Sequence, residues 1–352
     1  MGFSPQPFDA PPPKLIAVRA TTALADGQPQ RTLLDPGGAS EILSTASIIL
    51  KFDRFLLPSS ATRQSVCLWS DLTADVQTLE DCQNVAGAVR VFLEPTYNPV
   101  EREIILRRPP DQPRLTPGVR YRLAVLAPTG PDDPYGIRAF DGAPLPQTQQ
   151  IDFAVAAQDP PGAADELPPD QDLFCAPAGG VASYMQSCTF GAGCHKSVPG
   201  VSDAVMGLDL ATASLIQATA IGKVAHQTQT GEHADEPDVT PRRFGRAMPL
   251  IDPLNPGNSY LLYKTIIGPN AIDPALPPDE AAALAAEIDR LRGVVVVGLP
   301  MPPQQTPSFW LHAPADPMVD PSLVVPRVDG GDMDAITAWI AQGAPTRDCP
   351  AP

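Results

Sequence analysis

Basic residues are scarce in this chain of 352 residues, which has 24 lysines and arginines against 40 aspartates and glutamates. The formal net charge is −16. Because a nucleic-acid-binding surface needs basic residues to neutralise phosphates, this deficit excludes nucleic acid as an expected partner. No apolar run reaches the roughly 18 residues that a membrane-spanning helix needs. An acidic surface suits docking on a basic partner protein.

Common catalytic motifs are also missing: there is no Gly-x-Ser-x-Gly elbow, no phosphate-binding Walker loop and no dinucleotide-binding glycine motif. The first residues, MGFSPQPFDAPPPKLIAVRA (1–20), lack the basic start and apolar core of a signal peptide. Six cysteines nevertheless favour an exported protein. We therefore expect an extracytoplasmic location, periplasmic or on the cell surface, after removal of a leader that could also have supplied an anchor.

Proline is abundant, with 45 copies, and it disfavours long uninterrupted helices. Residues 1–13 are proline-rich and predict a flexible leader. From residue 14 to residue 157, short β-type runs alternate with turn residues, which is typical of a β-sandwich. The runs are KLIAVRA (14–20), SIILKFD (47–53), VCLW (66–69), VRVFLEP (89–95), EIILRR (103–108), YRLAVLA (121–127) and IDFAVA (151–156).

This segment resembles the bacterial Ig-like domain of S-layer and other surface proteins. The resemblance depends on SIILKFDRFL (47–56), LTPGVRYRLAVLA (115–127), FDGAPL (140–145) and QIDFAV (150–155). It implies an all-β Ig-like sandwich over residues 14–157 that acts as a spacer or docking module.

Two side-chain pairs in this segment have alternative interpretations. Cys67 lies on a predicted strand and Cys82 in the loop that follows, and we interpret them as a local disulfide, with two buried thiols as the alternative. Asp132 and Asp133 could bind calcium, although a solvated turn is the default interpretation of that pair.

A proline- and acid-rich linker is expected over residues 158–172. Beyond it, apolar residues recur at helical spacing, and helix start and stop signals bound several segments. Residues 173–352 are therefore expected to form a mostly α domain. The predicted helices cover 204–220, 259–266, 277–293 and 331–344.

The stretch SCTFGAGCHKS (187–197) places its second cysteine directly before a histidine, which is the order that a covalently attached haem needs. Thioether bonds from Cys188 and Cys194 would hold the porphyrin, and His195 could then turn onto the iron. The usual spacing puts two residues between the cysteines, whereas five lie between these. The glycines of TFGAG would give that loop its freedom to bulge outward. A Cys188–Cys194 disulfide with an exposed His195 is the alternative.

A second iron ligand is expected from LPMPP (299–303), where prolines stiffen the backbone on both sides of Met301. The alternatives are a loop methionine that covers a core, or a second histidine ligand. The remaining histidines are too scattered for a zinc site. They are His226, His233 and His312.

The order of elements resembles the c-type cytochrome domain of large exported bacterial proteins. After SCTFGAGCHKS come VMGLDLATASL (205–215), DPLNPGNSYLLYKTIIG (252–268), LPMPP and ITAWIAQGAP (336–345). The resemblance implies one covalent haem c, bound by Cys188 and Cys194, with His195 as the proximal ligand and Met301 as the distal ligand. The chain departs from that family in the five-residue gap and in a longer section over 221–247.

Because the ends of such cytochrome domains commonly pack together, the resemblance also implies a disulfide between Cys175 and Cys349, with two separate thiols as the alternative. The expected function is electron transfer by a monohaem carrier or relay that works with a basic redox partner, alone or associated with a surface or membrane complex. Iron with two protein ligands has no open position, so we expect no enzyme activity. The alternatives are a structural or adhesive surface protein without haem, and an enzyme with five-coordinate haem.

Overall fold

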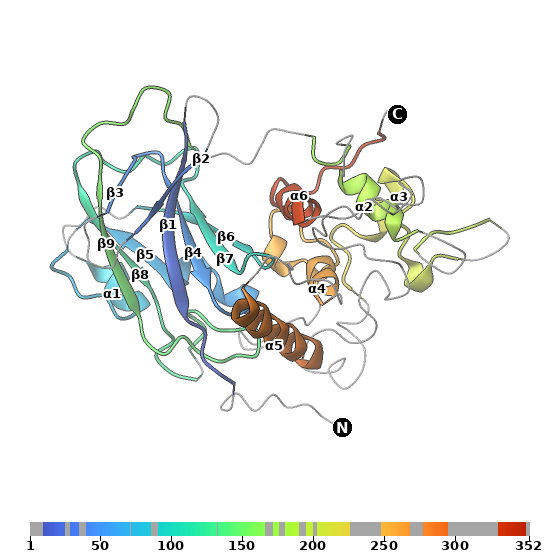
Figure 1. The fold of residues 1–352 in the computed structure, drawn as a ribbon, viewed down its shortest axis with the longest axis horizontal. Coiled ribbons are helices and arrows are strands. Elements are labelled where there is room, and N and C mark those ends of the chain that lie inside the picture. Colours follow the sequence, from blue (N-terminus) through green and yellow to red (C-terminus); the bar gives the residue numbers. More distant parts are fainter. Residues whose placement is uncertain are drawn as a thin grey trace. The chain divides into compact units, whose positions relative to one another are not determined.

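A computed structural model of the chain describes residues 10–24, 29–34, 40–70, 72–85, 91–131, 133–165, 172–175, 180–189, 195–199, 203–225, 248–267, 277–294 and 330–349. The chain divides into two compact units (Figure 1). The N-terminal unit consists mainly of Ser4–Leu167, and the C-terminal unit mainly of Pro168–Pro237 and Gly245–Pro352. The domain limits expected from the sequence stay a prediction.

Two sheets form the N-terminal unit. The first has the strand order β2-β1-β4-β7-β6 and is antiparallel throughout. The second has the order β3-β9-β8-β5, in which only the β3–β9 pair is parallel. The strands are β1 (Leu15–Ala23), β2 (Pro29–Leu33), β3 (Glu41–Ile42), β4 (Ser47–Phe52), β5 (Val66–Trp69), β6 (Glu94–Asn98), β7 (Glu103–Arg107), β8 (Arg120–Val125) and β9 (Gln149–Val155).

Alternating side chains from both sheets meet in one apolar core. Ile48, Leu50 and Phe52 supply the inward face of β4, and Phe153 and Val155 supply that of β9. Burial of these β-branched and aromatic side chains is the main stabilising term of the unit, at about 1.5–3 kcal/mol for each large side chain.

A buried ion pair connects two of the motifs that suggested the Ig-like resemblance. Arg54, directly after β4, donates to both carboxylate oxygens of Asp141, at 3.3 and 2.6 Å. The guanidinium also lies 5.4 Å from the ring centre of Phe140. Each charge satisfies the other in a water-poor site, so removal of either one alone would leave a costly unpaired charge.

Helix α1 (Leu79–Asn84) lies where the sequence suggested a loop. Thr78 and Asp81 form a capping box: the Asp81 amide donates to Thr78 Oγ1 at 3.1 Å, and the Thr78 amide donates to Asp81 Oδ2 at 2.8 Å. Cys82 on this helix is bonded to Cys67 on β5, which confirms the expected disulfide. The disulfide lies in a small apolar cluster that includes the fully buried Trp69.

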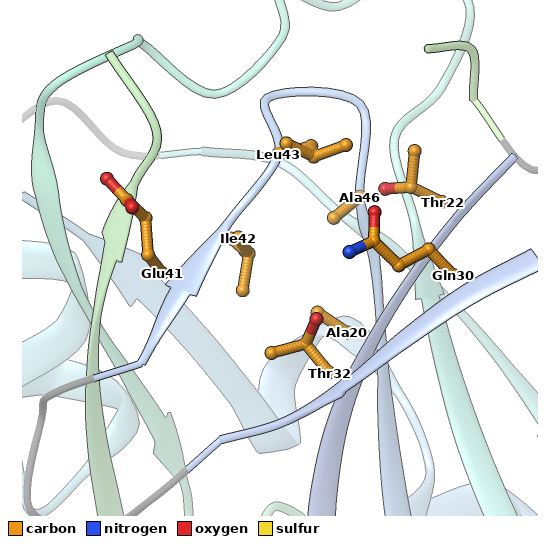
Figure 2. Close-up of a pocket in the computed structure, with 8 residues that line it drawn as sticks. All are labelled: Ala20, Thr22, Gln30, Thr32, Glu41, Ile42, Leu43 and Ala46. Carbon is orange, nitrogen blue, oxygen red and sulfur yellow. The ribbon is translucent and has the colours of Figure 1, made fainter. Parts of the chain in front are cut away.

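A small pocket opens beside β1, β2 and β3 (Figure 2). Its volume of about 40 Å³ has room for water but is far below the roughly 300–1,000 Å³ of small-molecule sites. The carboxylate of Glu41 points away from the other labelled side chains (Figure 2). This pocket is therefore too small to hold a cofactor. Its lining consists of Ala20, Thr22, Gln30, Thr32, Glu41, Ile42, Leu43 and Ala46.

Short helices make up most of the regular structure of the C-terminal unit. Every residue of α4 is buried, so this helix is surrounded on all sides. Arg292 of α5 donates two hydrogen bonds to the carbonyl of Ile267, at 3.0 and 2.6 Å, and so satisfies the end of α4. The helices are α2 (Val181–Ser187), α3 (Ala213–Thr219), α4 (Tyr260–Ile266), α5 (Pro278–Val294) and α6 (Gly330–Ala341).

The two ends of the C-terminal unit are joined covalently. Cys175 and Cys349 form the second disulfide, as expected. Beneath it, the rings of Phe174 and Trp339 lie 5.8 Å apart, and Trp339 Nε1 donates to the Pro345 carbonyl at 2.7 Å. The disulfide and the aromatic pair together hold α6 against the start of the unit.

The expected fold class, an all-β Ig-like sandwich followed by a mostly α cytochrome c-like domain, is wrong. The structure is mixed, with 26% helix and 25% strand in two small sheets and six described helices. Helix α1 interrupts the strands of the first unit, and isolated bridges pair Ile221 with Ile251 and Val224 with Pro249 in the second. Local capping and backbone pairing of extended segments leave little trace in apolar periodicity, which explains the error.

None of the described helices is long and apolar enough to cross a membrane.

The Cys67–Cys82 disulfide closes a loop with a sequence separation of 15 residues. We expect the double variant Cys67→Ala/Cys82→Ala to lose about 3 kcal/mol of unfolding free energy, because the unfolded chain regains the freedom of that loop. Urea unfolding measures the loss. Thr78→Ala, which breaks the capping box but keeps the disulfide, should cost only about 1 kcal/mol. A double variant as stable as the wild type would contradict the assigned role of the disulfide.

Candidate functional site

The loop that carries the haem-type motif returns to its own starting point. The amide of His195 donates to the carbonyl of Cys188 at 3.1 Å. This hydrogen bond brings the two residues together, although six residues separate them in the sequence. Cys188 is buried at the end of α2, where its Sγ lies 3.9 Å from the carbonyl of Tyr184. A sulfur and an imidazole therefore leave adjacent points of the backbone.

The imidazole of His195 is only 7% exposed. Among the described residues, its buried Nδ1 has no hydrogen-bond partner, which is unusual for a polar atom in a protein interior. Burial lowers the pKa of this histidine, and nearby backbone groups of Leu208 and Val205 offset part of that effect. A neutral imidazole with one unsatisfied nitrogen is the form in which histidine binds a metal.

Asp209 organises the backbone around His195. Its buried carboxylate accepts hydrogen bonds from the Ser197 amide at 2.9 Å and from the Ala211 amide at 3.0 Å. The Thr219 hydroxyl, from α3, donates to the Asp209 carbonyl at 2.9 Å. The next residue, Leu210, donates its amide to the His195 carbonyl at 2.9 Å.

The carboxylate of Asp209 remains ionised in this environment. Burial would raise its pKa, but the donors from Ser197 and Ala211 and the charge of Lys196 outweigh that effect and lower the pKa below its ordinary value of 3.8. The residues Gly207–Leu210 of the VMGLDLATASL stretch thus fix the backbone at His195 and at Ser197, two residues later. The sequence marked this element only as part of a resemblance, and it gave no role to Asp209.

Helix α2 is held in place by α4. The hydroxyls of Tyr184 and Thr265 lie 2.9 Å apart, and Thr265 Oγ1 also contacts the Leu261 carbonyl at 2.8 Å. Both side chains are buried. Because the carbonyl of Tyr184 lies near the sulfur of Cys188, α4 supports the first cysteine through this contact.

The structure describes two of the four predicted haem-binding residues, Cys188 and His195, and brings them together. Cys194 and Met301 lie outside the described residues. The histidines considered as alternative ligands, His226, His233 and His312, also lie outside them. Across the described ranges, no group of three histidine, cysteine or acidic side chains could hold a metal ion.

In the turn that was suggested as a calcium site, Asp133 makes hydrogen bonds that stabilise the turn itself. Its carboxylate accepts hydrogen bonds from the amide and hydroxyl of Thr129, at 2.8 and 2.6 Å, and from the Tyr135 amide at 2.9 Å. Burial opposes the change, but these donors lower the pKa of Asp133. The side chain closes the turn, and Asp132 lies outside the described residues.

No protein-family model, curated protein or solved structure matches this chain. The case for a cofactor therefore depends on the site itself. A covalent haem fits two features of it: a buried imidazole with an unsatisfied nitrogen, and a buried cysteine whose backbone lies next to that histidine.

Asp209→Ala should destabilise the C-terminal unit by about 1–3 kcal/mol, because two partly buried backbone amides lose a charged acceptor. The pKa of Asp209 is lower in the folded protein than its ordinary value of 3.8. The stability that the ionised carboxylate contributes is therefore fully present above pH 3.8 and is lost as the pH falls through the lower pKa of the folded state. Unfolding measured from pH 7 downward should therefore show the wild type and the variant converging in acid.

Asp209→Asn is the matched control for that measurement. Its one amide oxygen can accept from only one of the two backbone amides, and its NH2 group cannot accept from the other. This variant should therefore lose the charge and one hydrogen bond, and its loss of stability should follow the same trend with pH. A gap between wild type and Asp209→Ala that stays constant down to strong acid would contradict the ionised state assigned to Asp209.

Proposed function

We propose that the C-terminal unit carries one covalent haem c and that the protein transfers electrons. Cys188 and Cys194 would form the two thioether bonds, His195 would be the proximal ligand and Met301 the distal ligand. When bound, the haem supplies a one-electron redox centre. The unsatisfied buried nitrogen of His195, next to the backbone of Cys188, is the observation that carries this proposal.

The surroundings of His195 favour a rigid ligand. Hydrogen bonds hold its amide to Cys188 and its carbonyl to Leu210, and Asp209 fixes Ser197 two residues further on. A ligand that is already in place changes little when the iron changes its charge, which favours rapid electron exchange over slow rearrangement.

Two disulfides fit an oxidising environment outside the cytoplasm. We propose a periplasmic or cell-surface location, where covalent haem attachment and disulfide formation both take place. With a net charge of −16, the protein would dock on a basic redox partner, and salt would slow that encounter. The N-terminal unit would act as a spacer or docking module, since its described pocket is too small for a cofactor.

A structural or adhesive protein without haem is the second candidate. The observation that favours it is the gap of five residues between Cys188 and Cys194, which is wider than the usual two. On that view, the same cysteines would form a small disulfide and His195 would be a buried structural residue.

Haem attachment separates these two candidates. The full chain, matured in an oxidising compartment with the haem-attachment machinery, should give a band that stains for haem peroxidase after denaturing electrophoresis. Cys188→Ala/Cys194→Ala should give an unstained band at the same protein level, because no thioether can form. Cys67→Ala/Cys82→Ala is the control, since it removes two cysteines that belong to the other unit and should keep the stain. An unstained wild-type band would contradict the proposal.

The ligands are tested by visible absorption spectra of the matured protein. His195→Ala should abolish the low-spin spectrum, because the iron loses its proximal ligand. Met301→Ala should remove the sulfur-to-iron band and give a high-spin or histidine-replaced spectrum. Wild-type spectra in both variants would contradict the ligand assignment, and a high-spin wild type would point to a five-coordinate enzyme.

A further inference from the structure

The two disulfides among the described residues differ in their access to solvent. Cys67 and Cys82 are buried, at 4% and 7% exposure, inside a small apolar cluster. In the other disulfide, Cys349 is exposed and Cys175 is half-buried. Thiol–disulfide exchange needs a thiolate to reach one of the two sulfurs. Of these two disulfides, it is Cys175–Cys349 that presents a sulfur to solvent in the folded protein.

Cys175 belongs to a firmly held part of the C-terminal unit. The carbonyl of Leu173 accepts a hydrogen bond from the Val181 amide of α2 at 3.0 Å. The carbonyl of Phe174 accepts one from the Ala182 amide of the same helix, also at 3.0 Å. The Phe174 side chain is buried. This half of the disulfide would therefore keep its place if the bond between the sulfurs were broken.

Cys349 lies on a segment with few other attachments, which we call segment 345–349. Pro345, Arg347 and Asp348 are exposed, as Cys349 is. Within the described part of the chain, no backbone amide of residues 346–349 donates a hydrogen bond to another backbone group. The segment is therefore held by side-chain contacts and by the disulfide.

The contacts at the start of segment 345–349 do not reach the cysteine. Trp339 Nε1 donates to the Pro345 carbonyl at 2.7 Å and so fixes the first residue. The Thr346 hydroxyl donates to Gln217 Oε1 of α3 at 3.3 Å, which is longer than a typical hydrogen bond between two oxygens. Beyond Thr346, the position of the segment depends on other contacts.

An ion pair between Arg347 and Asp172 is the contact nearest to Cys349 in the segment. The Arg347 side chain is 64% exposed, and an ion pair surrounded by water contributes little to stability. The disulfide is therefore the main anchor of residues 347–349.

We propose that Cys175–Cys349 is a thiol–disulfide exchange site, which a dithiol reductant opens while the protein stays folded, and that opening releases segment 345–349. A thiolate of the reductant attacks the exposed sulfur of Cys349, and Cys175 leaves as a thiolate that takes up a proton. The second thiolate of the reductant then attacks the mixed disulfide and releases Cys349, which also becomes a thiol. The reductant ends as a disulfide, and two electrons have passed to the protein.

The change on opening is local. The rings of Phe174 and Trp339 stay packed beneath the disulfide, 5.8 Å apart, so α6 keeps its place. The contacts that are lost are the Arg347 ion pair and the hydrogen bond from Thr346 to α3. The exchange site goes beyond electron transfer and does not depend on haem attachment.

The first test measures the reduction of each disulfide in the full chain, produced in an oxidising compartment. Dithiothreitol is added without denaturant, and free thiols are alkylated and mapped over time. Cys175 and Cys349 should become alkylated at least about tenfold faster than Cys67 and Cys82, because buried sulfurs are reached only through local opening. The buried disulfide is thus an internal control in every sample. Equal rates, or no alkylation of Cys175 and Cys349 before the protein unfolds, would overturn the inference.

The second test measures the release of segment 345–349 with trypsin, which cleaves after Arg347. Cleavage at this bond should be about tenfold faster after reduction, because a freed segment can enter the protease. Cys175→Ser/Cys349→Ser should show the fast cleavage with and without reductant, and circular dichroism should show that both forms stay folded. An unchanged rate in reduced wild type would overturn the release. A chain without haem would contradict the proposed function alone.

Discussion

The hydrogen bond from the His195 amide to the Cys188 carbonyl sets the geometry of the whole candidate site. It fixes the two ends of the loop that carries the second cysteine. Once those ends are fixed, the number of residues between them matters little, since each doubling of loop length costs only about 0.6 kcal/mol. The wide gap between the cysteines is therefore compatible with a sulfur and an imidazole that leave the backbone side by side.

Two supports reach this point from different parts of the chain. Asp209 holds the segment after the histidine through backbone amides, and the Tyr184–Thr265 contact holds the helix before Cys188 against α4. The Cys175–Cys349 disulfide then ties the two ends of the unit together. Contacts from segments far apart in the sequence thus hold the chain before Cys188 and the chain after His195.

Much of the secondary structure could be predicted from apolar patterning, because β1, β4, β5, β7, β8 and β9 overlap the expected apolar runs. Buried residues alternate along β4, β7 and β9. The strand expected at 89–95 overlaps β6 only at its end, and residues 89 and 90 lie outside the described residues. Residues 91–93 are not in a strand, and β6 begins at Glu94, because its register depends on pairing with β7, where Tyr97 lies opposite Ile104. Helix α1 was missed because it begins at a capping box and shows no apolar periodicity that the sequence would reveal.

The helix expected over 204–220 is also broken, and the reason concerns the site. Met206 and Gly207 have positive φ, and the Asp209 carboxylate takes up the Ala211 amide, so α3 begins only after its N-cap Thr212. The cysteine and histidine of the site could be read from their adjacency in the sequence. The roles of Asp209 and Tyr184 could not, because each depends on tertiary contacts that composition does not encode.

Intact-mass spectrometry of the matured full chain, followed by mapping of the peptide that contains residues 188–195, tests the central claim most directly. The account predicts a single chain heavier by one haem, with the added mass on that peptide and with Cys188 and Cys194 both protected from alkylation even after reduction. A chain of unmodified mass whose peptide contains a Cys188–Cys194 disulfide would contradict it.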